Sequence, residues 1–581
     1  MVDESSPRPI DSLEALEVYA PPQPAGPTDL DLSSNEGSEP PQTVIDALCA
    51  LDVDEVRRYP TLSKLRGVIA EYHGVADERV LVTAGGDQAL DVLCRTYLDT
   101  ERTLVTHRPT FEMIGRYPRI LGADVTEVDW RRSPFPVDEF IEAVQAPTDI
   151  AVIVTPNNPT GATVTPDQFE TIVEVISPSL LVIDHAYVEF TNDDLTRRSL
   201  EYDNAVVIRT FSKALGLAGL RVGYALGPAE VISKLRRVRN PYPLSTPAIE
   251  AATARLEGDL EDVDRFITSI RSQRDDLMAT LETLGLRPYP SEANFILVES
   301  HPRWLFDGLA GLGIKVRLFP RRPTIDEHLR ITLPGSHRAF ERLERAIRTT
   351  VDPQTVLFDM DGVIADVRES YRRAVIDTAD AFSVTVTHED INEMKAAGDA
   401  NDDWELTHEL IEDAGINIDF ETVKQAFEDR YNGCGDFEPL YRHERPLVGD
   451  GFATLAQKIP LGIVTGRPHR DAHRFLEDHA LSTYFDVVVC KEDAPHKPNP
   501  TPVEMALEQL GCERGWLLGD TPDDIVAARR AGVLPLGVVP PGVDAEAHTD
   551  TLLNSGAARV FNADETLIDQ LVSQLRSLNM A

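Results

Sequence analysis

The distribution of apolar residues predicts a sheet in the first half of the chain. Short apolar runs, each of a length typical of a buried strand, recur between segments in which apolar residues have helical spacing. The runs lie at 80–83, 103–106, 150–154, 180–183 and 205–208, and helical segments include 41–50, 61–73, 87–98 and 167–176. Strands that alternate with helices in this way indicate a parallel α/β sheet covered on both faces.

This alternation stops and later begins again. Residues 229–285 are largely helical, and strands at 294–298, 315–318 and 329–332 with a helix at 337–349 indicate a smaller α/β lobe. After a linker at 350–355, a second parallel sheet is predicted from runs at 356–358, 462–464, 487–489, 515–518 and 536–539, with amphipathic helices at 367–445 inserted after its first strand.

The domain organisation follows from these shifts. We expect an N-terminal arm at 1–29, a first domain at 30–350 and a second domain at 355–581. The first divides into a large part at about 41–285 and a small lobe at about 286–350. The second carries a helical cap at about 366–445.

Charge narrows the range of partners. The 581 residues include 97 acidic and 56 basic side chains, which give a net charge of −41. Such a surface repels nucleic acid and anionic membranes, so neither is an expected partner. Abundant Asp and Glu with few Lys predict adaptation to molar salt, where the Debye length falls to ~3 Å, and a haloarchaeal source.

Other features of the sequence favour the cytoplasm. No apolar run approaches the ~20 residues of a membrane span, and the first residues lack a signal-peptide pattern. The five cysteines contain no Cys-x-x-Cys pair, which fits a reducing compartment without a disulfide framework or zinc site.

Polar residues follow several strands of the first sheet directly. Because ligands of parallel sheets bind beyond the carboxyl ends of the strands, we expect residues 85–87, Phe111, Asn158, Asp184 and Lys213 to form one site. Lys213 is one of nine lysines against 47 arginines. Unlike arginine, lysine can lose its proton and attack a carbonyl. A lysine, a carboxylate and phosphate donors at strand ends fit pyridoxal phosphate.

Four motifs give the first half a family resemblance. They are Asn-Asn-Pro-Thr-Gly at 157–161, Asp-x-Ala-Tyr at 184–187, Ser-Lys-x5-Gly-Leu-Arg-x-Gly at 212–223 and Pro-Tyr-Pro-Leu-Ser-Thr-Pro at 241–247. With them, residues 30–350 resemble a fold-type I aminotransferase that uses pyridoxal phosphate, and within that family the histidinol-phosphate aminotransferase group.

The resemblance implies a role for each matching residue. Lys213 would form the Schiff base with the cofactor and move a proton, and Asp184 would hold the ring nitrogen. The remaining cofactor contacts would come from Asn158 and Tyr187 at the ring oxygen, Phe111 on the ring face, and Gly86, Asp87, Ser212 and Arg221 at the phosphate.

The same resemblance implies the substrate contacts and a dimer. Arg330 would bind a carboxylate, Arg317 the phosphate of the substrate, and Asn35 a further part of the substrate. Tyr59 would reach the cofactor phosphate of a neighbouring subunit, which implies a homodimer.

The chain departs from the family pattern in places. His185 stands where Glu is usual and Phe111 where Tyr is common, and neither change removes a catalytic function. Arg321 and Arg322 compete with Arg317, so the substrate is less sharply defined than the reaction type.

A second candidate site follows the first strand of the second sheet. In Phe-Asp-Met-Asp-Gly-Val at 358–363, two carboxylates can hold Mg²⁺, and one can attack phosphorus while the other protonates the leaving oxygen. Val-Thr-Gly-Arg at 464–467, His-Lys-Pro-Asn-Pro at 496–500 and Gly-Asp-Thr-Pro-Asp-Asp at 519–524 follow. In this order the four motifs resemble the haloacid dehalogenase (HAD) superfamily, which implies a Rossmann-like fold, and the cap matches one subgroup.

This second resemblance implies a phosphate-transfer site. Asp359 would be the nucleophile and Asp361 the general acid/base, which favours phosphate chemistry over dehalogenation. Thr465 and Lys497 would bind the phosphoryl group, with Lys491 as the rival of Lys497. Mg²⁺ would be held by Asp359, Asp361 and Asp520, with Asp524 in support.

The sequence thus predicts a bifunctional enzyme with small-molecule substrates. The first half would transaminate an amino acid or amino-phosphate with glutamate or 2-oxoglutarate, and the second would hydrolyse a phosphate monoester through an aspartyl-phosphate. Alternatives are a phospho-amino-acid decarboxylase or aromatic aminotransferase joined to a sugar-phosphate phosphatase or mutase. The intact Lys213, Asp184, Asp359 and Asp361 argue against a non-catalytic binding protein.

Overall fold

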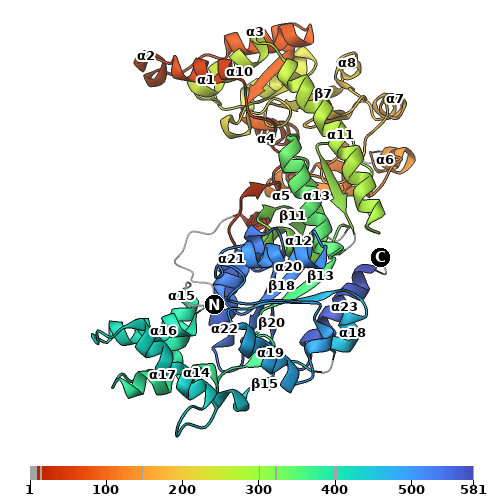
Figure 1. Ribbon diagram of the computed structural model, residues 1–581. Coiled ribbons are helices and arrows are strands. Elements are labelled where there is room, and N and C mark those ends of the chain that lie inside the picture. Colours follow the sequence, from red (N-terminus) through yellow and green to blue (C-terminus); the bar gives the residue numbers. More distant parts are fainter. Residues whose placement is uncertain are drawn as a thin grey trace. The chain divides into compact units, whose positions relative to one another are not determined.

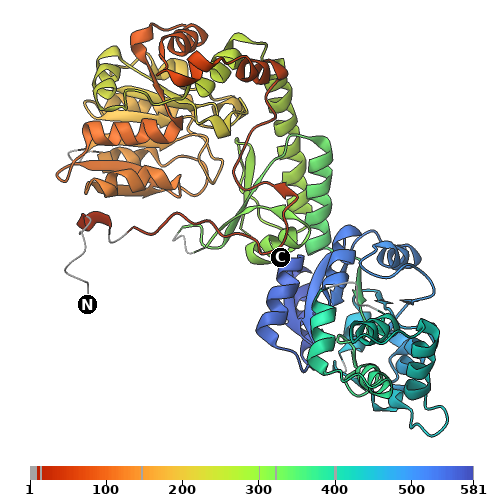
Figure 2. The same cartoon turned by 90° about the vertical axis from the view of Figure 1, so that its left-hand side faces the viewer.

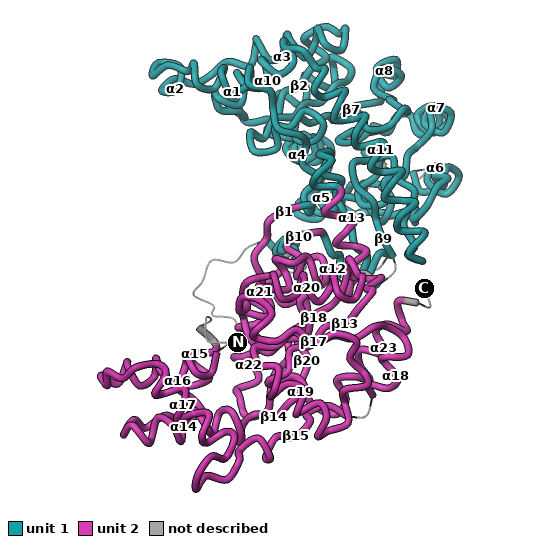
Figure 3. Tube along the Cα trace, in the orientation of Figure 1, with its two compact units in different colours: residues 1–22, 32–302, 317–340 teal, residues 23–31, 303–316, 341–581 magenta. Residues whose placement is uncertain are grey.

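The chain forms two compact units in its computed structural model, which describes residues 10–13, 16–144, 148–299, 301–320, 324–397, 402–449 and 451–579 (Figure 1). Unit 1 comprises Met1–Pro22, Leu32–Pro302 and Arg317–Phe340, and unit 2 comprises Gln23–Asp31, Arg303–Val316 and Glu341–Ala581 (Figure 3). Within the described ranges no helix is long and apolar enough to cross a membrane. Of the predicted arm, residues 1–9 and 14–15 lie outside these ranges.

The main sheet of unit 1 has the strand order β2-β8-β7-β6-β5-β3-β4, in which only the pairings of β8 are antiparallel. The strands are β2 (Val80–Thr83), β3 (Thr103–Arg108), β4 (Asp124–Asp129), β5 (Thr148–Val154), β6 (Leu180–Asp184), β7 (Ala205–Thr210) and β8 (Gly223–Leu226). Every run predicted as a strand forms one, whereas β4 and β8 were not predicted.

Alternate side chains of each central strand enter two different cores. Val152 and Val154 of β5 pack with Leu90 of α4 (Gly85–Tyr97) and Ile232 of α9 (Ala229–Val238). Ile153 packs on the opposite face of the sheet. That opposite face is covered by α6 (Val137–Val144) and α7 (Pro166–Val175). Helices therefore flank both faces of the sheet (Figure 2), and the predicted α/β class is confirmed.

The helices of unit 1 and its smaller lobe account for the rest of the first half. The helices are α1 (Gln42–Cys49), α2 (Val53–Arg57), α3 (Ser63–His73), α4 (Gly85–Tyr97), α5 (Glu112–Ile120), α6 (Val137–Val144), α7 (Pro166–Val175), α8 (Thr196–Ser199), α9 (Ala229–Val238), α10 (Thr246–Glu257) and α11 (Glu261–Thr283). The lobe contains an antiparallel sheet of β11 (Arg317–Phe319), β12 (His328–Thr332) and β9 (Phe295–Val298).

Unit 2 is built on an all-parallel sheet of strand order β17-β16-β13-β18-β19-β20. The strands are β13 (Thr355–Phe358), β16 (Leu461–Val464), β17 (Val487–Val489), β18 (Gly515–Gly519), β19 (Leu534–Val539) and β20 (Arg559–Asn562), the last of which was not predicted. Two short pairs, β1 (Leu30–Asp31) with β10 (Ile314–Lys315) and β14 (Ala365–Asp366) with β15 (Arg445–Pro446), complete its strands among the described residues.

Helices follow the strands of unit 2 and also form the expected insertion. The insertion contains α14 (Tyr371–Ala381), α15 (His388–Ala397), α16 (Asp403–Asp413) and α17 (Phe420–Asn432), which we call the cap. The other helices are α12 (Pro302–Gly311), α13 (His337–Val351, which begins in unit 1), α18 (Phe452–Ala456), α19 (His469–Asp478), α20 (Thr501–Leu510), α21 (Pro522–Arg530), α22 (Ala545–Ser555) and α23 (Leu567–Asn579).

Unit 2 includes segments that precede the predicted boundary at 350–355. The fully buried Trp516 of β18 donates its indole N–H to the carbonyl oxygen of Thr349 at 2.9 Å, and its ring lies 5.2 Å from that of Trp304. Arg559 donates to Asp307 at 2.7 Å. The sheet of unit 2 therefore packs directly on helices α12 and α13, which precede the predicted linker at 350–355.

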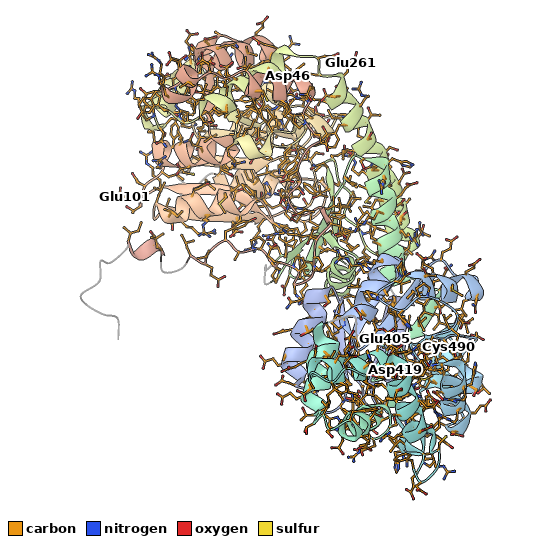
Figure 4. All side chains as sticks on the ribbon, turned by 60° about the vertical axis from the view of Figure 1, so that its left-hand side comes forward. Asp46, Glu101, Glu261, Glu405, Asp419 and Cys490 are labelled. Atoms are coloured by element: carbon orange, nitrogen blue, oxygen red, sulfur yellow. The ribbon has the colours of Figure 1, made fainter. Side chains whose placement is uncertain are left out.

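Acidic side chains stand on the surface of both units. Asp46, Glu101 and Glu261 are exposed in unit 1, as are Glu405 and Asp419 in the cap (Figure 4). This distribution matches the even spread of acidic residues along the sequence.

We expect Trp516→Ala to lower the free energy of unfolding by about 3–5 kcal/mol, because it leaves a cavity and removes the indole that covers Thr349. Urea unfolding followed by circular dichroism measures the change. The matched control is Phe437→Ala at a half-exposed cap residue, which should change stability by less than about 0.5 kcal/mol. Equal stability of the two variants would refute the packing role.

Candidate active sites of the two units

The lysine loop of unit 1 begins where β7 ends. Thr210 Oγ1 donates to Ser212 Oγ at 2.9 Å and accepts the backbone N–H of Ser212 at 3.1 Å, which fixes the turn into Lys213. The Lys213 amine donates to the carbonyl oxygen of Ser34 at 2.8 Å. Burial, and after it the nearby Arg330 guanidinium, lower the pKa of this amine to about 7. The amine is therefore substantially neutral near pH 7.

The segment 33–35 ties several site residues together. The Ser33 carbonyl oxygen accepts from Arg330 Nη2 at 2.5 Å, and the Ser34 carbonyl oxygen accepts from Lys213. Asn35, in the left-handed region at φ 55°, donates to the Tyr187 hydroxyl at 3.0 Å and accepts from Thr332 Oγ1 at 2.8 Å. Asn35 was expected as a substrate contact, whereas no role was expected for Ser33 and Ser34.

Asp184 ends β6 as a buried carboxylate. Its Oδ1 accepts the backbone N–H of Ala186 at 3.1 Å, and no cationic side chain among the described residues forms an ion pair with it. Burial raises its pKa to about 7. Such a carboxyl group is suited to a cationic partner supplied from outside the chain.

His185, which stands in place of the usual Glu, has both ring nitrogens occupied. Nδ1 lies 2.5 Å from the Thr155 carbonyl oxygen and Nε2 accepts the backbone N–H of Leu195 at 3.2 Å, an arrangement that places the proton on Nδ1. Burial lowers its pKa to about 4, so the ring is neutral. The residue therefore holds two loops in place.

Donors for a phosphate gather at the N-terminus of α4. Arg221 donates to Ser212 Oγ at 3.5 Å and to Asp87 Oδ2 at 3.0 Å. A side chain on Gly223 would lie 2.4 Å from the Gly85 carbonyl carbon, so glycine allows β8 to approach this turn. A helix N-terminus, a hydroxyl and a guanidinium together match a phosphate dianion.

A cavity of about 410 Å³ brings two of the expected substrate contacts, Arg317 and Arg330, together with two expected cofactor contacts, whereas Asn35 is not among its lining residues. It is lined in part by Phe111, Asn158, Arg317 and Arg330. Arg330 Nη1 donates to Asn158 Oδ1 at 2.6 Å. The structure thus brings these four residues together, while the competing Arg321 and Arg322 lie outside the described residues.

Tyr59 stands apart from this cavity on the surface. Its ring is 79% exposed and stacks on Tyr242 at 4.3 Å between ring centres. The expected contact of Tyr59 with a neighbouring subunit stays a prediction.

The chemistry of these donors fits pyridoxal phosphate. An amine that is neutral near pH 7, a buried carboxylate without a cation and a phosphate-sized set of donors are the three features that the cofactor needs.

The second site lies at the carboxyl ends of β13, β16 and β18 in unit 2. Asp359, Asp520 and Asp524 are buried, and their carboxylate oxygens lie within 4.8 Å of one another. Lys497 donates to Asp359 Oδ1 at 2.6 Å and forms an ion pair with Asp524. Burial raises the pKa of Asp359 and of Asp520, in which nearby carboxylates reinforce the effect.

Glycines permit this crowding of carboxylates. A side chain on Gly362, at φ 75°, would lie 2.2 Å from Asp520 Oδ2, and one on Gly519 would lie 2.1 Å from Asp524 Cβ. Asp524 also accepts from the Thr521 hydroxyl at 2.7 Å in a capping box that starts α21. Three oxygen donors with a single lysine fit a hard divalent cation such as Mg²⁺.

Asp361 departs from the expected metal set. Its carboxylate is not part of the cluster just described, because Arg467 Nε binds its Oδ1 at 2.6 Å, whereas Asp524 belongs to the cluster. Arg467 also binds Glu444 at 2.9 Å. The motif at 464–467 contained Arg467 without a role, and nothing in the sequence pointed to Glu444.

The expected phosphoryl contacts lie at strand ends of this site. Thr465 follows β16, is buried, and its hydroxyl oxygen accepts the backbone N–H of Arg467 at 3.2 Å. The rival Lys491 is instead paired with Asp402 and lies 3.7 Å from the centre of the Trp404 ring in the cap.

Comparison with known proteins finds a family match in each half of the chain. Residues 27–348 match aminotransferase class I and II, and residues 356–538 match haloacid dehalogenase-like hydrolase. A histidinol-phosphate aminotransferase of Roseiflexus castenholzii is 34% identical over 319 residues, covering 52% of this chain and 84% of that protein.

Two further likenesses are more limited. An imidazoleglycerol-phosphate dehydratase of Phytophthora nicotianae is 45% identical over 198 residues, or 32% of this chain, which spans only 44% of that relative. The histidinol-phosphate aminotransferase of Sinorhizobium meliloti, solved in complex with pyridoxal-5'-phosphate, matches 60% of this chain and 99% of its own with a TM-score of 0.53. At 22% identity this likeness shows the fold alone.

In the cofactor-free protein we expect the Lys213 amine to titrate near pH 7 instead of 10.5, because burial disfavours the ammonium form. Above that pH the neutral amine should react with an acylating reagent, and mass spectrometry can follow the modified lysine as a function of pH. Lys234, whose pKa is raised by Glu230, serves as the internal control. A Lys213 midpoint near 10 would refute the effect of burial.

Proposed function

Since the chain belongs to the aminotransferase class I and II family over residues 27–348, we propose that its first half transfers an amino group between glutamate and a phosphate ester of the histidinol-phosphate type. The observation that carries this proposal is the convergence of Lys213 and Arg330 on adjacent carbonyl oxygens of the segment 33–35. The likeness to histidinol-phosphate aminotransferases supports the substrate class.

The chain's own residues have distinct tasks in this reaction. Pyridoxal phosphate, when bound, supplies an electron-accepting ring for carbon–hydrogen bond cleavage at the amino carbon. Lys213 would hold it and then move the proton, a task that suits an amine with a pKa of about 7. Asp184 would bind the ring nitrogen, Asn158 and Tyr187 the ring oxygen, and Phe111 the ring face. Gly86, Asp87, Ser212 and Arg221 would hold the phosphate.

Two arginines of the cavity match substrates that carry two negative groups. Arg330 would bind the carboxylate of glutamate and Arg317 the distal carboxylate or phosphate, with Asn35 as a further contact. Burial lowers the pKa of Arg330 only to about 10, so it keeps its charge near pH 7.

We propose that the second half hydrolyses a phosphate monoester. Asp359 Oδ would attack phosphorus while Asp361 gives its proton to the leaving alkoxide. Water would then attack the aspartyl-phosphate, return its proton to Asp361 and release inorganic phosphate. Thr465 and Lys497 would bind the phosphoryl oxygens, and Asp359, Asp520 and Asp524, whose carboxylates lie together, would hold Mg²⁺, which leaves Asp361 as the acid/base.

The two reactions can be consecutive. Transamination leaves the phosphate ester of its substrate intact, so its product remains a substrate for a phosphatase. Two relatives, a histidinol-phosphate aminotransferase and an imidazoleglycerol-phosphate dehydratase, are both named after phosphate esters. This supports a single route through both sites.

The wider context follows the same lines. Val53, Val56 and Tyr59 lie close together in the sequence and are 80%, 65% and 79% exposed, and this exposure of apolar side chains supports a homodimer through the first half. The net charge of −41 supports a cytoplasm rich in salt.

Given glutamate and imidazole-acetol phosphate in molar KCl, the purified protein is expected to release both 2-oxoglutarate and inorganic phosphate. Lys213→Ala should abolish 2-oxoglutarate release, whereas Asp359→Asn should abolish hydrolysis of p-nitrophenyl phosphate and leave transamination intact. Each loss should exceed ~10³-fold, because each residue forms the covalent bond of its site. Release of CO₂ without an oxo-acid would instead indicate a decarboxylase.

Removal of divalent ions should separate the two activities. EDTA is expected to stop phosphate release. In the absence of a divalent cation, Asp359, Asp520 and Asp524 repel one another and the anionic phosphate. Mg²⁺ should restore it, and 2-oxoglutarate release should not change. Full phosphatase activity in EDTA would exclude the metal from the reaction.

A further inference from the structure

Arg467 is a charged residue beside the hydrolase site that is almost fully enclosed. Its side chain is 1% exposed and lies in the loop that follows β16. Nε donates to Asp361 Oδ1 at 2.6 Å, and Nη1 donates to Glu444 Oε2 at 2.9 Å. A guanidinium removed from water in this way depends on both carboxylates for its charge balance.

The two carboxylates come from different parts of unit 2. Asp361 follows β13 of the core, whereas Glu444 lies where the chain leaves the cap, immediately before β15. Glu444 is 3% exposed, and its Oε1 accepts from the Tyr431 hydroxyl of α17 at 2.8 Å. Arg467 therefore joins a residue of the catalytic loop to the last helix of the cap.

Packing of the guanidinium also depends on the cap. Its Cζ lies 4.9 Å from the ring centre of Tyr371, which belongs to the first cap helix, α14. The Tyr371 hydroxyl in turn donates to the buried Asp471 of α19 at 3.0 Å. The cap thus supplies both an ion-pair partner and an aromatic wall for Arg467, and the core alone supplies neither Glu444 nor Tyr371.

We propose that Arg467 is a positioning residue that holds the Asp361 carboxylate in its working orientation only while Glu444 and the cap are packed against the core. This inference rests on the proposed role of Asp361 as general acid/base. Without Glu444, the guanidinium keeps Asp361 as its one close carboxylate among the described residues, and the Tyr371 ring, which forms no ion pair, is left to hold it from the cap side.

The inference predicts a dependence on the leaving group. An alkyl phosphate needs a proton from Asp361 as its alkoxide departs, whereas p-nitrophenolate departs without one. Misplacement of Asp361 should therefore slow an alkyl ester much more than an aryl ester. A general loss of folding would slow both esters to the same extent.

The experiment uses the full-length protein with Mg²⁺ and compares Arg467→Lys, Glu444→Gln and wild type on histidinol phosphate and p-nitrophenyl phosphate. Both variants should lose kcat on the alkyl ester at least ~10-fold more than on the aryl ester, with KM little changed. The matched control is Arg514→Lys, which alters an arginine–carboxylate pair with Asp352 outside the cap and should leave the ratio unchanged. Equal losses on both esters would overturn the proposal.

A second measurement keeps the inference independent of turnover. Hydrogen exchange of the same variants should be faster in α17 and in residues 359–363 for both Arg467→Lys and Glu444→Gln, and unchanged for Arg514→Lys. Unchanged exchange at these segments would overturn the link between cap and carboxylate. If wild type hydrolyses neither ester, the proposed phosphatase function fails. The exchange result alone then tests whether Arg467 and Glu444 connect the cap to Asp361.

Discussion

Burial of ionised groups is the constraint on which both sites depend. In unit 1, Asp184 is buried and Lys213 is half-buried, and neither forms an ion pair among the described residues, so burial moves both pKa values toward neutrality. In unit 2, Lys497 lies between Asp359 and Asp524, and the carboxylates still outnumber it. Each site is thus short of positive charge at a defined place, beside Asp184 in unit 1 and among the carboxylates in unit 2, and the proposed pyridine ring and metal ion would supply that charge.

Parallel strands provide the scaffold that makes such burial possible. Strands that end at one edge bring side chains from distant positions together, and a helix that starts there offers free N–H groups. Glycine then sets how closely the loops approach, since Gly223 lies against Gly85 in unit 1 and Gly362 against Asp520 in unit 2. The backbone, as much as the functional side chains, defines the two constellations.

Sequence reasoning succeeded where the signal was local. Continuous apolar runs identify buried strands, but β4, with exposed Asp124 and Asp129, alternates like a surface strand, and β8 is short and begins with glycine. Asp184 and Asp359 could be placed at the ends of strands because each directly follows an apolar run in the sequence. The Arg467–Glu444 pair and the carbonyl oxygens of segment 33–35 were not, because their partners are distant in sequence and meet only in the folded chain.

The packing of Trp516 against Thr349 and Trp304 determines where the chain can be divided without loss of its interior. A break between the two family matches, at residues 349–355, would strip each product of part of its interior: an indole on one side, and the cover of α12 and α13 on the other. Either fragment would then expose apolar surface that promotes aggregation. A division of the chain that leaves α12 and α13 with the second sheet, as in unit 2, would instead keep this packing intact.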